Sequence, residues 1–251
     1  MKNFLNISDL SSYELRKVIE EAKTRKSKRK DSNKSAADFD QPFVGRTMVM
    51  IFEKPSTRTR ISFDIAAKQL GGSSIILNPD VIHYGKGDES IKDTAKVLSE
   101  YADIIMVRTS LHKNLVEFAK YSDIPVINGL SEQSHPCQVM SDILTFEEIK
   151  GNIKNKTITW LGDGNNNMSN SYIEASAKFG FKLNIGCPDK YKPNKNIIAW
   201  AKKNKANIII TKNPNEAVKN ADCVITDKWV SMNDKVDKKK KKQILKGYQV
   251  N

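Results

Sequence analysis

The stretch FEKPSTRTRISFDIAAKQLGG, residues 52–72, joins the end of an apolar run to a helical pattern through a loop of hydroxyl-bearing and cationic side chains. The apolar run TMVMIF, residues 47–52, has the length of a buried strand, and the apolar residues after the loop recur with helical spacing. Two glycines end the helix, and a second apolar run, residues 73–77, follows. A strand, a helix and another strand in this order predict a βαβ unit with parallel strands.

The same alternation continues along the chain. Further strands are predicted at residues 103–108 and 125–129, and then at residues 157–162, 183–186, 207–211 and 222–226. A long helix pattern with proline in its first turn covers residues 136–150, and Gly151 follows it. We therefore expect an α/β protein with two doubly wound parallel-sheet domains, residues 1–150 and 151–251. Loops after the strands would line a cleft between the domains.

The two ends of the chain carry weaker patterns. Ser11 and Glu14 have capping-box spacing and predict an amphipathic helix near the N-terminus. The polar tail of that helix, residues 23–40, loses the period and is predicted to be a solvated loop. At the other end, residues 247–251 alternate Tyr248 and Val250, a pattern that predicts the start of a strand.

Composition narrows the classes of partner. The net charge of +13 is typical of a nucleic-acid binder, but only seven of the 42 basic residues are arginine and the lysines are spread along the chain. A solvated lysine-rich surface explains this better, so no nucleic-acid partner is expected. No apolar run approaches the roughly 20 residues of a membrane span, and the N-terminus lacks a signal-peptide pattern. We expect a cytoplasmic protein. The three cysteines and three histidines are scattered, so no disulfide frame or metal site is predicted.

The loop after the first strand predicts an anion pocket. Hydroxyl groups of Ser56, Thr57 and Thr59 and the guanidinium of Arg58 stand where a helix begins, and a helix start attracts anions. The alternative is an ordinary N-cap, but a cap needs one hydroxyl, so phosphate binding is favoured. The motif is neither a P-loop nor a dinucleotide fingerprint, and GDGNNN, the nearest approach to one, lacks the third glycine. No nucleotide cofactor is expected.

Three other loops carry candidate side chains. His135 and Gln138 open the helix of residues 136–150, and both side chains can donate a hydrogen bond to a carbonyl oxygen. The alternative for His135 is a helix cap. The loops of the second half carry a carboxylate, two amides and a hydroxyl, which suit a zwitterionic ligand with an amine. These groups belong to Asn166, Asn167, Asp227 and Ser231, each of which could instead be a turn residue.

The motifs FxxPSTRTR, RT at Arg108, HPCQ, GDGNN and DxWxSM together resemble the aspartate/ornithine carbamoyltransferase family. The resemblance covers the chain from its first helix to its last residue, and residues 227–232 indicate ornithine as the amino acid. It implies that the carbamoyl group of carbamoyl phosphate passes to the δ-amine of L-ornithine, giving citrulline and phosphate, as in arginine biosynthesis. No metal or organic cofactor is implied.

The resemblance also implies roles for single residues. Carbamoyl phosphate would contact Ser56, Thr57, Arg58, Thr59, His83, Arg108, His135 and Gln138, of which Arg108, His135 and Gln138 would act on the reacting group. Ornithine would contact Asn167, Asp227, Ser231 and Met232. His83 belongs to a loop that the family lends to a neighbouring subunit, so a homotrimer or a multiple of it is implied.

The sequence departs from the family pattern in two places. His83 stands where many members have glutamine, which changes little because some members carry histidine there. The family continues past KGYQV into a strand with an HCLP motif and a final helix, and this sequence stops at Asn251. We therefore expect slow turnover or none. The alternative is an inactive homologue that binds carbamoyl phosphate or only oligomerises.

Overall fold

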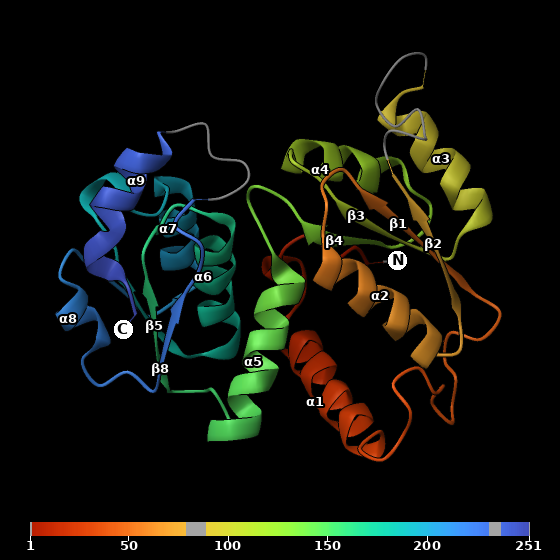
Figure 1. The fold of residues 1–251 in the computed structure, drawn as a ribbon, viewed down its shortest axis with the longest axis horizontal. Helices are drawn as coiled ribbons and strands as arrows, with labels where there is room; N and C mark the ends of the chain where they lie inside the picture. The colour runs from red at the N-terminus through yellow and green to blue at the C-terminus, as the bar shows by residue number, and fades with distance from the viewer. Residues whose placement is uncertain (1, 79–88, 231–236, 251) are drawn as a thin grey trace. The chain divides into compact units, whose positions relative to one another are not determined.

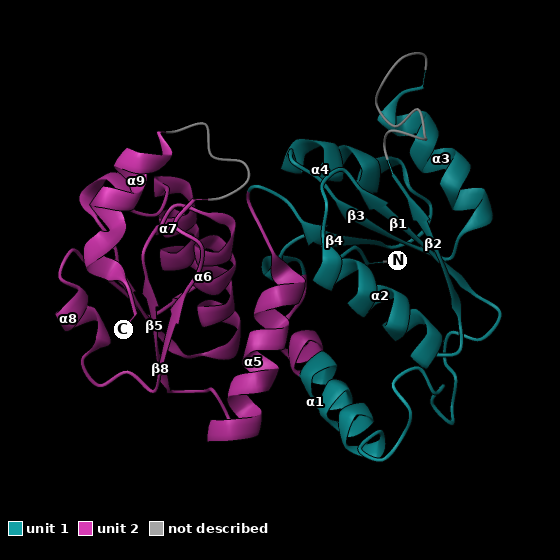
Figure 2. Cartoon of the chain, in the orientation of Figure 1, with its two compact units in different colours: residues 1–9, 17–132 teal, residues 10–16, 133–251 magenta. Residues whose placement is uncertain are grey.

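The computed structural model describes residues 2–78, 89–230 and 237–250. Contacts between residues divide the chain into two compact units, coloured teal and magenta in Figure 2. The first unit holds Met1–Asp9 and Lys17–Glu132, and the second holds Leu10–Arg16 and Gln133–Asn251. Among the residues described, no helix combines the length and the apolar character that crossing a membrane requires.

The first unit is built on one parallel sheet. Its strands are β1 (Thr47–Phe52), β2 (Ser73–Leu77), β3 (Ile104–Arg108) and β4 (Val126–Leu130), in the order β2-β1-β3-β4. The crossover helices are α2 (Thr57–Gln69), α3 (Ile91–Tyr101) and α4 (His112–Tyr121), as Figure 1 shows. A short 3-10 turn, η1 (Ile7–Asp9), lies near the N-terminus. The four strands predicted for this half of the chain are confirmed, each with its ends within one residue.

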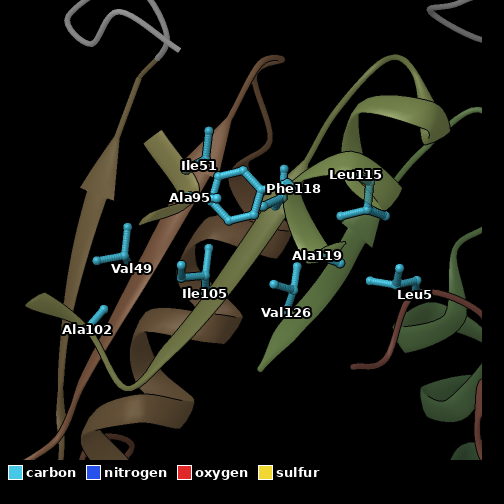
Figure 3. Close-up of a cluster of buried hydrophobic side chains, with 11 residues drawn as sticks. Leu5, Val49, Ile51, Ala95, Ala102, Ile105, Leu115, Phe118, Ala119 and Val126 are labelled. Atoms are coloured by element: carbon cyan, nitrogen blue, oxygen red, sulfur yellow. The ribbon is translucent and has the colours of Figure 1, made fainter. Parts of the chain in front are cut away.

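Strand β1, in the interior of the first unit's sheet, is buried on both faces. On one face, Val49 and Ile51 of β1 pack in a cluster with Phe118 of α4 (Figure 3). On the other face, Met50 packs with Ala67 of α2. Alternate residues of β1 thus face opposite helix layers, and burial on both faces explains why the strands read as continuous apolar runs.

The order of the strands marks where a ligand would bind in the first unit. The chain leaves β1 for β2 on one side of it and then crosses to β3 on the other side. The connections after β1 and β3 therefore diverge, and ligands of open parallel sheets bind at such a switch point. The residues after β1, which begin with Glu53, and Arg108 at the end of β3 lie at this edge.

The second unit repeats the architecture. Its parallel sheet has the order β7-β6-β5-β8, formed by β5 (Thr157–Leu161), β6 (Lys182–Gly186), β7 (Ile208–Thr211) and β8 (Cys223–Thr226). The helices are α5 (Pro136–Lys150), α6 (Asn167–Phe179), α7 (Lys195–Lys203) and α8 (Pro214–Val218), with a 3-10 turn η2 (Asp189–Tyr191). Here the switch point lies between β5 and β8. The predicted α/β class with two parallel sheets is confirmed.

The first helix is longer than predicted. The capping box is confirmed, because the backbone N–H of Glu14 donates to Ser11 Oγ at 3.2 Å and the N–H of Ser11 donates to Glu14 Oε2 at 2.9 Å. However, α1 (Ser12–Lys28) continues into the segment predicted to be a loop. Ion pairs of Arg25 with Glu21 and Asp38 stabilise this last part of the helix. The spacing of apolar residues, from which the helix was predicted, does not report such pairs.

The prediction of a strand at residues 247–251 is wrong. A helix, α9 (Lys238–Leu245), precedes it, and Lys246–Tyr248 form a 3-10 turn, η3. Tyr248 is buried in a cluster with Leu161 and Ala217, and its hydroxyl donates to the carbonyl oxygen of Lys212 at 2.7 Å. The ring of Tyr248 therefore fills a core position from a turn rather than from a strand.

Candidate active site

The start of α2 leaves its backbone donors available. Ser56 occupies the N-cap position, with φ −157° and ψ 109°, but its side chain makes no capping hydrogen bond. The first N–H groups of a helix have no partner within the helix, and its N-terminus carries partial positive charge. Thr57 and Arg58 are exposed here, and Ser56 and Thr59 are half-buried. The N-cap alternative predicts a capping hydrogen bond from Ser56, and that bond is absent, so the backbone donors of this helix start remain available to an anion.

Arg108 brings a buried positive charge to the same edge of the sheet. Its side chain is 7% exposed, and Nη1 lies 3.4 Å from Thr59 Oγ1. Among the described residues no carboxylate pairs with it, and its Nε has no hydrogen-bond partner. Burial lowers the pKa of Arg108, and the nearby charge of Arg58 lowers it further. Two arginines with no acidic partner at a helix N-terminus are arranged for a multiply charged anion.

The second arginine of the STRTR motif has a different position. Arg60 Nη2 donates to Asn78 Oδ1 at 2.8 Å, and its guanidinium lies 5.0 Å from the centre of the Phe52 ring. These contacts tie α2 to the residue after β2 and cover the end of β1. Arg60 is therefore a structural residue, and Arg58 is the arginine of the motif that is available to a ligand.

Glu53 organises the loop after Arg108, a role that the sequence did not reveal. Its Oε1 accepts from the hydroxyl of Thr109 at 2.7 Å, and its Oε2 accepts from the backbone N–H of Ser110 at 2.8 Å. The backbone N–H of Glu53 also donates to the carbonyl oxygen of Arg108 at 3.0 Å. The ends of β1 and β3 are thus held together next to the two arginines. A lone acidic residue directly before a cationic motif was the only available signal.

His135 and Gln138 lie in the second unit, at the start of α5. His135 holds the N-cap position with φ −136° and ψ 66°, yet its side chain makes no capping hydrogen bond. Its backbone N–H donates to Ser171 Oγ on α6 at 2.9 Å, which fixes the start of the helix. The half-buried imidazole and the exposed Gln138 side chain therefore stand at the helix entry without serving as its cap.

A carboxylate absent from the sequence prediction lies one turn after Gln138. Asp142 Oδ1 accepts from Gln138 Nε2 at 2.8 Å, and Oδ2 accepts from the hydroxyl of Tyr172 at 2.6 Å. Burial raises the pKa of Asp142; the two hydrogen bonds oppose this rise and the charge of Asp227 adds to it. Burial raises the pKa of the Tyr172 hydroxyl, and the charge of Asp142 raises it further. Tyr172 stays a neutral donor, and Asp142 is the acceptor for both groups.

The switch point of the second sheet carries Asn166, Asn167 and Asp227. Asn166 is the N-cap of α6, because its Oδ1 accepts from the backbone N–H of Ser169 at 2.9 Å. The side chain of Asn166 is therefore used within the fold as a helix cap, a role that differs from both the ligand contact and the turn residue considered for it. Asn167 begins α6, and the exposed Asp227 follows the end of β8. His83, Ser231 and Met232 lie outside the described residues.

A buried ion pair stabilises the loop between β5 and α6. Lys241 of α9 donates to Asp163 Oδ2 at 2.6 Å, and the two side chains are 4% and 7% exposed. Asp163 Oδ1 accepts from the backbone N–H of Asn165 at 2.8 Å, and its carbonyl oxygen accepts from Asn166 Nδ2 at 3.0 Å. The loop that leads to Asn167 is thus held by α9, the helix that comes after Asp227 in the chain.

Comparison with known proteins identifies the family. Residues 2–148 match the model described as the carbamoyl-P binding domain of aspartate/ornithine carbamoyltransferase, and residues 154–251 match its Asp/Orn binding domain. The chain belongs to the aspartate/ornithine carbamoyltransferase family. The two family models together cover both compact units.

Individual relatives agree with the family. The chain is 49% identical to the ornithine carbamoyltransferase of Rhodopseudomonas palustris over 250 residues and 45% identical to that of Brucella ovis over 251 residues. In both comparisons all of this chain aligns with 78% of the relative's length. The solved ornithine carbamoyltransferase of Pyrococcus furiosus superimposes with a TM-score of 0.90 at 37% identity, over 99% of this chain and 79% of that one.

The family models and the contacts divide the chain at different places. The carbamoyl-P binding model extends to residue 148 and so includes His135 and Gln138. By contacts, these two residues and the start of α1 belong to the second unit. His135 and Gln138 therefore lie in the second compact unit, although the carbamoyl-P binding model includes them.

Proposed function

We propose that this protein transfers the carbamoyl group of carbamoyl phosphate to the δ-amine of L-ornithine, giving L-citrulline and phosphate. The observation that carries the proposal is the buried guanidinium of Arg108 beside Thr59 and the free N-terminus of α2. Among the described residues no acidic side chain neutralises it, so a bound phosphate would complete the site. Membership of the family supplies the chemistry that this anion site serves.

The proposed reaction joins nitrogen to carbon and releases phosphate. The uncharged δ-amine of ornithine attacks the carbonyl carbon, and negative charge builds on the carbonyl oxygen near Arg108, His135 and Thr59. The bond from that carbon to the bridging oxygen then breaks, phosphate leaves with the bonding electrons, and the nitrogen loses a proton. Fixed donors aimed at the developing charge are the main source of rate in such reactions.

The remaining assignments belong to the same proposal. Ser56, Thr57, Arg58 and Arg108 bind phosphate, Gln138 binds the carbamoyl group, and ornithine is bound by Asn167, Asp227, Ser231 and Met232. The functional boundary lies near Gly151, with residues 1–150 serving carbamoyl phosphate and residues 151–251 serving ornithine. The family resemblance also supports a cytoplasmic enzyme of arginine biosynthesis.

A two-acceptor assay tests the proposed function. The protein is incubated with carbamoyl phosphate and either L-ornithine or L-aspartate, and citrulline and carbamoyl aspartate are measured over time. We expect citrulline with ornithine and no product with aspartate. Citrulline at the level of the protein-free control, together with measurable binding of carbamoyl phosphate, would instead support the inactive-homologue alternative.

Replacing Arg58 with alanine is expected to weaken carbamoyl phosphate binding at least tenfold. A hydrogen bond from a charged group typically contributes about 1.5–3 kcal/mol, and tenfold corresponds to about 1.4 kcal/mol. Titration calorimetry measures the affinity. Lys120→Ala is the matched control, since it removes the same charge from the C-terminal end of α4. Equal affinities for the Arg58 variant and the wild type would remove Arg58 from the site.

We also propose that the protein forms a homotrimer or a multiple of it. The family resemblance supports this, and the edge strand β2 leaves Ile75 50% and Ile76 36% exposed, one on each face of the strand, so a partner subunit could bury apolar side chains there. His83, from the loop expected to reach a neighbouring site, lies outside the described residues. Sedimentation at micromolar concentration should give at least three times the chain mass of 28.3 kDa. A single species at the chain mass would contradict a trimer.

A further inference from the structure

The amide group of Gln138 is held in one orientation. Its Nε2 donates to Asp142 Oδ1 at 2.8 Å, one turn later on α5. An ionised carboxylate has only acceptor sites, so the NH2 end of the amide must face Asp142. The Oε1 atom of Gln138 then points away from the carboxylate, on the other branch of an exposed side chain. Gln138 therefore offers a ligand an acceptor and not a donor.

The carboxylate that sets this orientation is itself fixed. Asp142 Oδ2 accepts from the hydroxyl of Tyr172 on α6 at 2.6 Å. Tyr172 is 2% exposed, and its ring lies 5.9 Å from that of the buried Trp160. The hydroxyl of Tyr172 is thus held by the core of the second unit. It anchors one oxygen of Asp142 and leaves the other for Gln138.

We propose that Asp142 is a positioning residue, which turns Gln138 so that Oε1 accepts a hydrogen bond from the NH2 group of the carbamoyl donor. This rests on the proposed function and deepens it. The sequence suggested that Gln138 donates to the carbonyl oxygen, and the contact with Asp142 reverses that assignment. An acceptor at this place distinguishes a carbamoyl group from an acetyl group of the same shape, because a methyl group leaves Oε1 unpaired.

A pair of stable ligands tests the proposal by binding alone. Phosphonoacetamide and acetonylphosphonate both carry a CH2 group in place of the bridging oxygen, so neither transfers its acyl group. They differ only in an NH2 group against a CH3 group beside the carbonyl. Calorimetry on the wild type should give phosphonoacetamide at least a tenfold higher affinity. Equal affinities, or a preference for acetonylphosphonate, would overturn the proposal.

Four variants distinguish a loss of Gln138 orientation from general damage to the fold. Asp142→Ala frees the amide of Gln138 to rotate, so the preference should fall severalfold, mainly through weaker phosphonoacetamide binding. Gln138→Leu changes an exposed side chain and should remove the preference. The double variant should match Gln138→Leu, because Asp142 acts through Gln138. Tyr172→Phe removes one anchor of Asp142 but leaves the carboxylate beside Gln138, so it should reduce the preference for phosphonoacetamide less than Asp142→Ala does.

Several results with these variants would contradict the proposal. Loss of affinity for both ligands by the same factor in Asp142→Ala would show that Asp142 serves only the fold. The proposal would also be contradicted if Gln138→Leu kept the preference for phosphonoacetamide. An equal loss of that preference in Tyr172→Phe and Asp142→Ala would contradict it too. If neither ligand binds the wild type, the proposed function fails as well, whereas equal binding of both overturns only the role of Asp142.

Discussion

Arg108→Met is expected to lower kcat/KM for carbamoyl phosphate about a thousandfold without lowering the stability of the protein. Removing one donor to a developing oxyanion costs about a hundredfold to a thousandfold in rate, and the lost charged contact also weakens binding of the phosphate. The steady-state rate of citrulline formation measures the loss.

Most core substitutions lower the stability of a protein, but Arg108→Met is expected to keep or raise it. Arg108 is 7% exposed and has no acidic partner among the described residues, so folding without ligand buries an uncompensated charge. Methionine fills similar space without that charge, and thermal unfolding of the ligand-free variant should occur at the wild-type temperature or above it. Carbamoyl phosphate should raise the unfolding temperature of the wild type only.

Arg108→Lys is the matched control for charge. It keeps a cation but loses the planar fork that binds two phosphate oxygens at once, so an intermediate kcat/KM is expected. A methionine variant with wild-type kcat/KM would show that Arg108 does not touch the reacting groups. A methionine variant that unfolds many degrees lower would show that Arg108 is needed by the fold itself.

Lys241→Met is expected to lower the free energy of unfolding of the second unit by about 3–5 kcal/mol, the usual cost of breaking one side of a buried ion pair. The variant leaves the carboxylate of Asp163 buried without its cation. Urea unfolding can be followed by tryptophan fluorescence, because the buried Trp160 donates through Nε1 to the carbonyl oxygen of Asp163 at 3.0 Å. The KM for ornithine should rise as the loop before Asn167 loosens.

Two control variants bracket this effect. The double variant Asp163→Asn with Lys241→Met should recover much of the loss, since the neutral amide oxygen can still accept from the backbone N–H of Asn165. Lys96→Met removes one side of an exposed pair with Asp123, whose side chains are 49% and 61% exposed, and should cost less than about 1 kcal/mol. Similar losses for Lys241→Met and Lys96→Met would contradict the assigned burial.

The sheets and the phosphate loop could be predicted because their signals are local. Strands buried on both faces read as apolar runs, and the hydroxyl-rich start of α2 stands out within a few residues of sequence. Arg108 was found because arginine is rare in this chain. Its burial and its lack of an acidic partner appear only when β1 and β3 pair.

The features that sequence reasoning missed depend on distant partners. Lys241 sits in a run of lysines that reads as a solvated face, and its burial requires Asp163, 78 residues earlier. Asp142 looks like an ordinary polar residue of a helix until Tyr172, 30 residues later, donates to it. Glu53 likewise gains its role only when the loop after β3 folds against it.

Formation of one covalent bond tests the central claim most directly. Carbamoyl phosphate labelled with ¹³C at its carbonyl carbon is mixed with ornithine labelled with ¹⁵N at the δ position, and the mixture is followed by NMR with the protein present. We predict that a one-bond coupling between the two labels appears at the rate of phosphate release. Phosphate release at the protein-free rate, with no coupled signal above that control, would contradict the account.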